Sequence, residues 1–192
     1  MSTQEKVVNP VKVITGKNTR WSYLYVFEPR AVAEGATPKY SVSLIIPKDD
    51  DVTIQKIKDA IQAAYNEGQG VLRGTSKVVP PLSAIHNPLR DGDKEKPEDE
   101  AYKNSFFVSA NSTKAPGILD AAKNPITDPE EVYSGCYGRA SITFFPYNSN
   151  GNKGIGCGLN NLMLVRKGEP LGGRSSAEAD FAEYEDDDEL FD

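Results

Sequence analysis

A pair of long alternating segments, joined by a short turn, constrains the fold of this chain most. Residues 135–147 and 154–165 flank Asn148-Ser149-Asn150-Gly151-Asn152. An Asn-Gly pair between two alternating segments is typical of a β-hairpin. In the first segment the polar and aromatic odd-numbered positions share one face, and the even-numbered positions, which include Ala140 and Ile142, share the other. The chain is therefore expected to build an antiparallel sheet around this hairpin.

Further strands and one helix are predicted before the hairpin. Alternation predicts strands over residues 20–27, 39–47 and 105–111, with a shorter candidate at 117–122. A helix is expected over residues 52–67, because isoleucines recur there at helical spacing after three aspartates that can cap its start. Five or more antiparallel strands with one inserted helix predict a mainly β or α+β fold around a small, partly open barrel.

The charge of the chain is segregated. The formal net charge is −6, from 22 basic and 28 acidic residues. Nine of the acids lie in residues 178–192, which hold no base, so residues 1–177 carry 19 acids against 22 bases, a net charge of +3. We expect one domain over residues 1–177 and a disordered acidic tail over residues 178–192. A mildly basic body indicates a polyanionic partner.

Membrane, disulfide and catalytic functions find little support. No apolar run is long enough to span a membrane, and residues 1–10 lack a signal peptide, so an intracellular protein is expected. Cys136 and Cys157 are expected to be reduced and buried. The one histidine, His86, lies in a predicted loop, and no phosphate-binding or nucleophile motif occurs. No catalytic residue, cofactor or metal site is therefore assigned.

Aromatic residues beside basic ones are the richer signal. Single-stranded nucleic acid binds by stacking bases on aromatic rings and by pairing phosphates with Lys or Arg. Phe27, Tyr40, Phe106 and Phe144 are expected in the core. The predicted DNA-binding residues share faces with polar or basic neighbours, and they are Arg20, Trp21, Tyr23, Tyr25, Lys39, Arg90, Tyr137, Arg139, Tyr147 and Lys153.

The acidic tail ends in a run that includes two apolar residues. Leu190 and Phe191 can enter the pocket of a partner protein while the acids meet its basic rim. The tail can also lie in the basic groove of its own domain and compete with nucleic acid. The predicted partner-binding residues are Asp186, Asp187, Asp188, Glu189, Leu190, Phe191 and Asp192.

Two alternatives of other classes stay open. Asp91 and Asp93 lie in one acidic loop, and paired carboxylates can hold Mg²⁺ in a nuclease. The chain can also be an interaction protein that acts through its acidic tail and binds no DNA.

Several motifs, in order along residues 10–177, together carry a family resemblance. They are Tyr25-Val26-Phe27-Glu28-Pro29, Pro88-Leu89-Arg90-Asp91-Gly92-Asp93 and Tyr133-Ser134-Gly135-Cys136-Tyr137-Gly138-Arg139-Ala140, with residues 39–48, 148–159 and 168–173. On these motifs the chain resembles phage-encoded single-stranded DNA-binding proteins, a family first catalogued as a domain of unknown function.

The resemblance implies an OB-fold that binds single-stranded DNA with little sequence preference during phage replication or recombination. It implies the cytoplasm of an infected bacterium as the location, and a tail that recruits phage or host replication proteins. Tails of bacterial relatives commonly end in Phe, whereas here Asp192 follows Phe191. A phage-specific partner is therefore expected.

Overall fold

The computed structural model describes residues 9–171, so the predicted domain boundary at residue 177 and the predicted tail over residues 178–192 lie outside it. The strands are β1 (Lys12–Ile14), β2 (Arg20–Arg30), β3 (Lys39–Pro47), β4 (Arg90–Asp91), β5 (Ser105–Ser112), β6 (Gly117–Leu119), β7 (Tyr137–Ser149) and β8 (Asn152–Arg166). The α-helices are α1 (Asp51–Glu67), α2 (Gln69–Arg73) and α3 (Gly92–Glu95), and the 3₁₀ turns are Leu82–Ala84 and Glu100–Tyr102.

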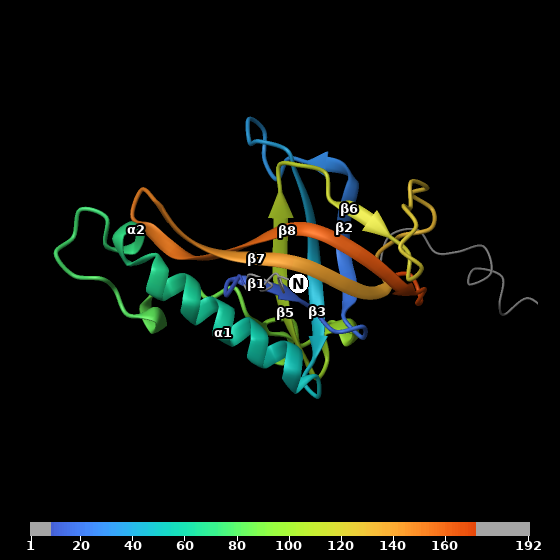
Figure 1. The fold of residues 1–192 in the computed structure, drawn as a ribbon, viewed down its shortest axis with the longest axis horizontal. Helices are drawn as coiled ribbons and strands as arrows, with labels where there is room; N and C mark the ends of the chain where they lie inside the picture. Colours follow the sequence, from blue (N-terminus) through green and yellow to red (C-terminus); the bar gives the residue numbers. More distant parts are fainter. Residues whose placement is uncertain (1–8, 172–192) are drawn as a thin grey trace, which may run out of the picture.

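Five of the strands close into a ring. β2 pairs with β3, β3 with β5, β5 with β8, β8 with β7, and β7 with β2. The long β7–β8 ribbon crosses the β2, β3 and β5 strands in Figure 1. This closed five-stranded arrangement is that of an OB-fold barrel, as predicted. One detail differs from the expected antiparallel barrel, because β5 and β8 run parallel where they meet.

The β7–β8 hairpin forms where the sequence predicts it. Asn150 and Gly151 have φ angles of 52° and 87°, and the two strands pair directly on either side of them. Positive φ at both central residues is the geometry of the tight turns that favour Asn-Gly. The hairpin extends beyond the ring, and the side chain of Asn148 donates to the carbonyl of Val71 in α2.

The predicted helix is α1, which lies beside the barrel in Figure 1. The side chain of Asp50 caps it by accepting from the backbone N–H of Thr53 at 3.2 Å. Its face with Ile54, Ile57 and Ile61 is buried, and it packs against β1 and β7.

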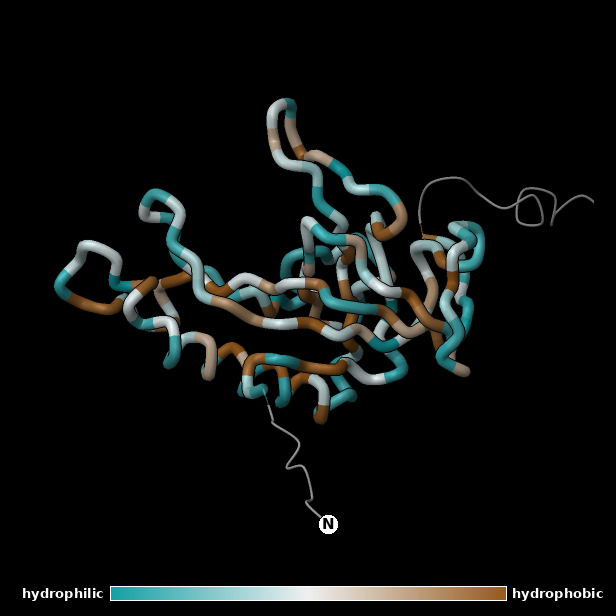
Figure 2. Tube along the Cα trace, turned by 45° about the horizontal axis from the view of Figure 1, so that its top comes forward, coloured by the Kyte–Doolittle hydropathy of each residue, from teal (hydrophilic) through white to brown (hydrophobic). Residues whose placement is uncertain are grey.

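Apolar and polar residues alternate along the strands in Figure 2, which is the pattern of a barrel with one buried and one exposed face.

An irregularity in β2 changes which aromatic residues face the solvent. Tyr23 has a φ of 46°, and the pairing of β2 with β3 shifts in register between Ser22 and Tyr25. Such a bulge reverses the alternation of the strand. Trp21 is therefore completely buried, and the prediction that it stacks on bases is wrong. Tyr23 at the bulge is 52% exposed.

The aromatic residues predicted to lie in the core are buried or half-buried. Phe144 is buried, while Phe27 and Phe106 are half-buried against the core and Tyr40 is half-buried. Cys136 and Cys157 are buried free thiols, as expected, and burial raises the pKa of Cys157. No helix within residues 9–171 is both long and apolar enough to cross a membrane.

Candidate nucleic-acid interface

A groove on the outer surface of the barrel collects three of the predicted residues. One part of it encloses about 420 Å³ between β3, β5 and the β7–β8 hairpin, and its lining includes Lys39, Arg90 and Tyr147. A second depression continues it toward the β2–β3 loop and shares Lys39 and Asn111 with the first. We call these two depressions the groove. It lies between the β2–β3 loop and the β7–β8 hairpin, where OB-folds generally bind oligonucleotides.

Short polar residues line the floor of the groove. Asn111 of β5 is one of them, and it pairs with Ser41 of β3 and with Gly158 of β8. Ser109 and Gly156 lie one step along the same surface and line the groove. Short side chains leave the backbone surface open, so a ligand can approach the sheet closely.

Phe145 is the most exposed aromatic residue of this surface. It belongs to the same face of β7 as Tyr147, and its side chain is 43% exposed. A Cβ at Gly156 would come within 2.6 Å of the ring, and one at Gly158 within 3.8 Å, so the ring lies over this glycine-rich stretch of β8. One side of the ring packs on the sheet, and the other is presented to solvent. That is the geometry of a stacking platform.

Tyr147 and His86 form the wall near the hairpin. Their ring centroids are 6.5 Å apart, and both side chains approach Gly154, where a Cβ would clash with them. The backbone of His86 bonds to Lys153 and Ile155, which fixes the 86–90 segment beside β8. The predicted residue Lys153 lies at this end too, but its ammonium points to the carbonyl of Arg73, 3.4 Å away, and does not line the groove.

The charge of the groove is positive. Arg30, Lys39 and Arg90 line it, and no carboxylate does. Arg90 is held by Glu95, with contacts of 2.9–3.0 Å, and its guanidinium lies 4.9 Å from the centre of the Phe107 ring. Lys39 is exposed and has no ion pair among residues 9–171. A phosphate that enters the groove therefore meets Arg30 and Lys39, together with Arg90, whose charge Glu95 partly compensates.

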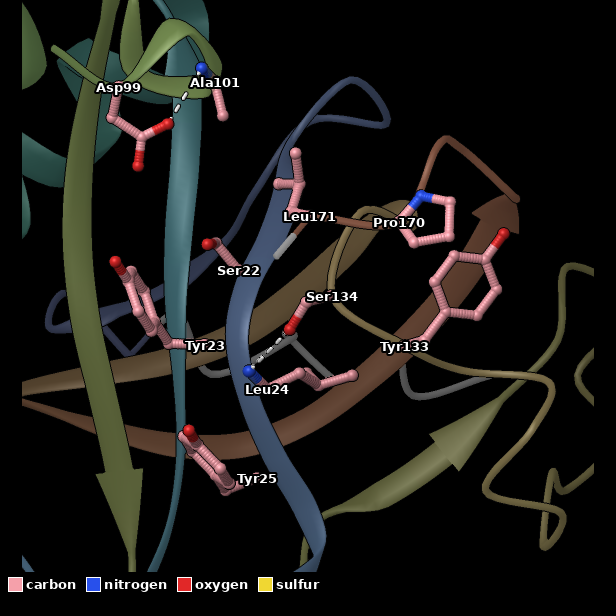
Figure 3. A pocket seen from close by; sticks show the side chains of 10 residues that line it. All are labelled: Ser22, Tyr23, Leu24, Tyr25, Asp99, Ala101, Tyr133, Ser134, Pro170 and Leu171. Carbon is pink, nitrogen blue, oxygen red and sulfur yellow. Dashed lines mark hydrogen bonds between the residues drawn. The ribbon is translucent and has the colours of Figure 1, made fainter. Parts of the chain in front are cut away.

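Tyr23 and Tyr25 line a different pocket, shown in Figure 3. Its other walls include Tyr133 and Leu171, and Asp99 stands at its rim. The phenol of Tyr133 donates to the carbonyl of Gly168 at 2.7 Å, and burial raises its pKa.

Acidic residues extend from this pocket. The adjoining depression shares Tyr23 and Asp99 with it and is lined by Glu95, Glu98 and Glu100, against one lysine. Carboxylates repel phosphate, so stacking by Tyr23 stays a prediction with less electrostatic support than the groove has. Tyr25 lies nearer to the groove, because the guanidinium of Arg30 donates to its hydroxyl and lies 4.7 Å from the centre of its ring. Stacking by Tyr25 likewise stays a prediction.

The remaining predicted residues lie at the far end of β7. Tyr137 pairs with Arg20 in β2, and Arg139 follows two positions later on the same exposed face. They do not line the groove, so the structure divides the predicted DNA-binding residues among three places.

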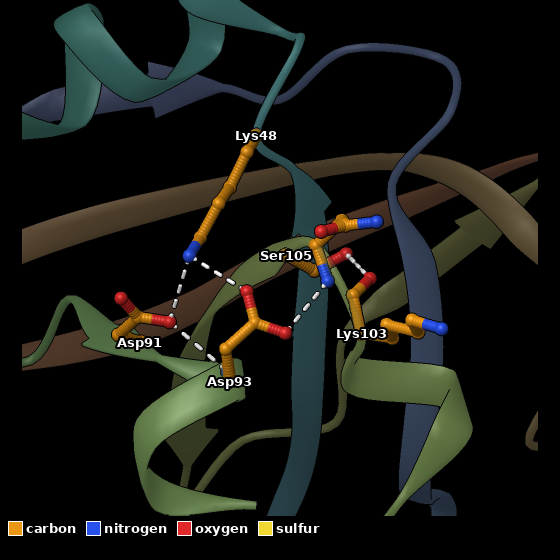
Figure 4. A network of polar contacts seen from close by, with 6 residues as sticks. Lys48, Asp91, Asp93, Lys103 and Ser105 are labelled. Atoms are coloured by element: carbon orange, nitrogen blue, oxygen red, sulfur yellow. Dashed lines mark hydrogen bonds and ion pairs between the residues drawn. The ribbon is translucent and has the colours of Figure 1, made fainter. Parts of the chain in front are cut away.

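Asp91 and Asp93 are engaged by a lysine (Figure 4). The ammonium of Lys48 lies 3.0 Å from Asp91 Oδ1 and 2.8 Å from Asp93 Oδ2. Asp91 also accepts from the N–H of Asp93, and Asp93 from that of Asn104. Hydrogen bonds from Lys48 hold the pKa of both carboxyls below the usual range and raise the pKa of the lysine. This network ties the end of β3 to the 91–104 segment, which is a structural role.

Residues 11–191 match the sequence model of one protein family, whose description is the single-stranded DNA-binding protein of Enterobacter phage Enc34. The chain belongs to this family. A protein of Acyrthosiphon pisum secondary endosymbiont phage 1, p50, is 32% identical to it over 168 residues, which are 84% of this chain and 88% of the relative.

Solved structures share the fold of this Enc34-family chain. The Enc34 protein in complex with single-stranded DNA matches with a TM-score of 0.70 and 24% identity, over 84% of this chain and 90% of that one. The gp2.5 single-stranded DNA-binding protein of bacteriophage T7 matches with a TM-score of 0.61 and 17% identity, over 92% and 96% of the two chains. At these identities the likeness is one of fold.

Sequence reasoning missed Phe145, Arg30 and His86 as groove residues. Phe145 was identifiable from the sequence, because it lies two residues before Tyr147 on the same face of the predicted strand. The glycine-rich stretch of residues 154–158 lies in the partner strand opposite it. Arg30 ends β2, beyond the strand predicted over residues 20–27, and His86 lies in an irregular segment whose path no local pattern encodes.

Proposed function

We propose that this protein is a non-enzymatic single-stranded DNA-binding protein and that the groove is its binding site. One observation carries the proposal: the groove combines the exposed ring of Phe145 and the half-buried ring of Tyr147 with Arg30, Lys39 and Arg90, and no carboxylate lines it. Membership of the Enc34 family supports the same function.

Stacking and charge have separate roles in this proposal. Bases stack on Phe145 and Tyr147 at about 1–3 kcal/mol each, without regard to sequence, because every base has a π-face. Arg30 and Lys39 contact the phosphates on the opposite wall. Since residues 1–177 carry a net charge of only +3, we expect stacking to supply much of the affinity.

A binding assay with matched variants tests the groove. The affinity of the full chain for a fluorescent oligo(dT) is measured by anisotropy over a range of salt concentrations, beside duplex DNA and RNA of the same length. The wild type should prefer the single strand. The double variant Arg30→Gln, Lys39→Gln should bind more weakly, with a salt slope smaller by about 1.4 if each residue contacts one phosphate.

The control exchanges Lys56 and Lys58 for Gln, because both are exposed on α1 and outside the groove. This pair removes the same charge and should leave the affinity nearly unchanged. Equal losses in the two double variants would remove the groove from the binding site.

The acidic tail has a regulatory part in the proposal. Residues 186–192 recruit a phage or host replication protein, and residues 178–192 compete with DNA for the groove. Deletion of residues 178–192 should therefore tighten DNA binding at low salt. Unchanged or weaker binding would argue against competition, and a pull-down with the tail peptide tests recruitment.

We propose that the protein protects single-stranded DNA during phage replication or recombination, in the cytoplasm of the infected bacterium. Incubation of single-stranded DNA with the protein and Mg²⁺ should leave the strand intact, because Lys48 already engages both carboxylates of the alternative nuclease site.

A further inference from the structure

A cluster of three arginines surrounds Tyr137, at the end of β7 away from the groove. The guanidinium of Arg166 lies 4.0 Å from the centre of the Tyr137 ring, and that of Arg20 lies 5.1 Å from it. Arg139 projects from the same face of β7 two residues further along. We call Arg20, Arg139 and Arg166 the arginine cluster.

Neutral acceptors hold all three side chains in place. Arg20 donates to the carbonyls of Gly135 and Glu169, at 3.2 and 2.8 Å. Arg139 donates to the carbonyl of Thr15 at 3.2 Å, and Arg166 donates to the side-chain oxygen of Asn18 at 2.9 Å. None of the three forms an ion pair within residues 9–171. The cluster is therefore oriented but not neutralised.

Uncompensated positive charge of this kind suits a phosphate ligand. Three cations repel one another, and a bound anion removes that repulsion. The planar guanidinium matches phosphate with paired N–H donors, better than an ammonium does. Exposed Lys17 and Lys167 lie close to the cluster in sequence, against one exposed carboxylate, Glu169, so the local charge stays positive.

A polar path connects the cluster to the groove. Arg139 and Phe145 share one face of β7, six residues or about 20 Å apart at the rise of a strand. Between them that face carries only Ser141 and Thr143, whose hydroxyls both accept from the side chain of Asn160. No acidic residue interrupts this stretch of β7.

We propose that the arginine cluster is a second phosphate-binding site, for the same DNA strand as it leaves the groove along β7. This inference rests on the proposed function. Tyr137 acts in it as a positioning residue, because guanidiniums lie against its ring where a base was expected to stack. The protein consequently covers more nucleotides than the groove alone holds.

Oligonucleotide length separates the two sites. Short oligo(dT) of about 5 nucleotides and long oligo(dT) of about 16, near the two ends of the range for one OB-fold, are titrated with the full-length chain. The double variant Arg139→Gln, Arg166→Gln should bind the short strand as the wild type does. It should bind the long strand more weakly, with a salt slope smaller by about 1.4.

Two further variants keep the test decisive. Arg139→Lys, Arg166→Lys keeps the charge and should retain most of the salt slope. Arg139→Gln alone touches one carbonyl contact, and it replaces the double variant if circular dichroism shows that the double variant is unfolded. The Lys56→Gln, Lys58→Gln protein is again the charge-matched control.

Results that contradict the second phosphate-binding site can be told apart from results that contradict the groove. Unchanged affinity and slope for the long strand, or equal losses for both lengths, would overturn the second site while the groove stands. Tighter binding of the long strand by the double variant would assign the cluster to the acidic residues 178–192 and overturn the DNA path. If the wild type binds neither strand, it is the proposed function that fails.

Discussion

The ring of Phe145 on β7 lies over Gly156 on β8, where a Cβ would stand 2.6 Å from the ring. The glycine removes the side chain that would otherwise lift the ring from the sheet. One face of Phe145 is thereby fixed and the other is left for a ligand.

Replacement of Phe145 by Ala should weaken binding of single-stranded DNA by roughly 5- to 150-fold, the equivalent of about 1–3 kcal/mol for one stacked base. The side chain is 43% exposed, so the fold should be retained. Fluorescence anisotropy measures the affinity and circular dichroism checks the fold. Phe145→Trp is the matched control and should keep the affinity, and an Ala variant that binds normally would exclude Phe145 as a platform.

Two neighbouring glycines provide a finer test of the same platform. Gly156→Ala places a methyl group against the ring and should displace Phe145, with an affinity loss up to that of Phe145→Ala. Gly158→Ala meets its nearest atom, the Thr143 carbonyl oxygen, at 3.5 Å, which is an ordinary contact, and should be tolerated. The same oligo(dT) titration decides between them. Equal effects of the two substitutions would mean that the position of the ring does not matter for binding.

The single tryptophan, Trp21, should affect stability rather than binding. It is completely buried, and replacement by Ala should cost about 3–5 kcal/mol of unfolding free energy, measured by urea denaturation. Trp21→Phe should cost less, since the indole N–H has no hydrogen-bond partner in the described residues, and should retain DNA affinity. Strong quenching of Trp21 fluorescence by bound oligo(dT) would contradict this assignment.

The contacts of Lys48 with Asp91 and Asp93 should make the free energy of unfolding depend on pH in the acidic range. Lys48 lowers the pKa of Asp91 and Asp93 from the ordinary value of 3.8, so their contribution to stability is present above that pH and is lost as the pH falls through the lowered values. In Lys48→Met this contribution is missing. The difference in urea midpoint between wild type and Lys48→Met should therefore shrink below about pH 3.8. A difference that stays constant from pH 7 to pH 3 would show that the ion pairs contribute nothing.

The regular parts of this fold were predictable from local patterns. Alternation located β3, β5, β7 and β8, and helical spacing after an aspartate cap located α1. The face of β7 that carries Arg139 and Tyr147 was correct because that strand alternates without a break. The parallel meeting of β5 and β8 was not predictable, since it depends on closure of the ring.

The site was harder to predict than the fold. A single bulge at Tyr23 reversed the expected faces of β2, and alternation alone gives no sign of a residue with positive φ other than glycine. Arg90 lines the groove, and its predicted contact with DNA stays a prediction. Arg166 was overlooked because its partner Tyr137 is a neighbour only across the β7–β8 pairing.

Two seams close the ring of the barrel: β2 pairs with β7 through Arg20 and Tyr137, and β5 pairs with β8 through Asn111 and Gly158. Outside the ring, β1 and α1 also pack against β7. One part of the chain supplies β2, β3 and β5, and a later part supplies β7 and β8. The groove straddles the second seam, and the arginine cluster straddles the first. Neither part of the chain holds a complete site, so the proposed binding surface exists only when the two parts are docked together. A strand bound across both seams fastens the two parts together and should slow their separation.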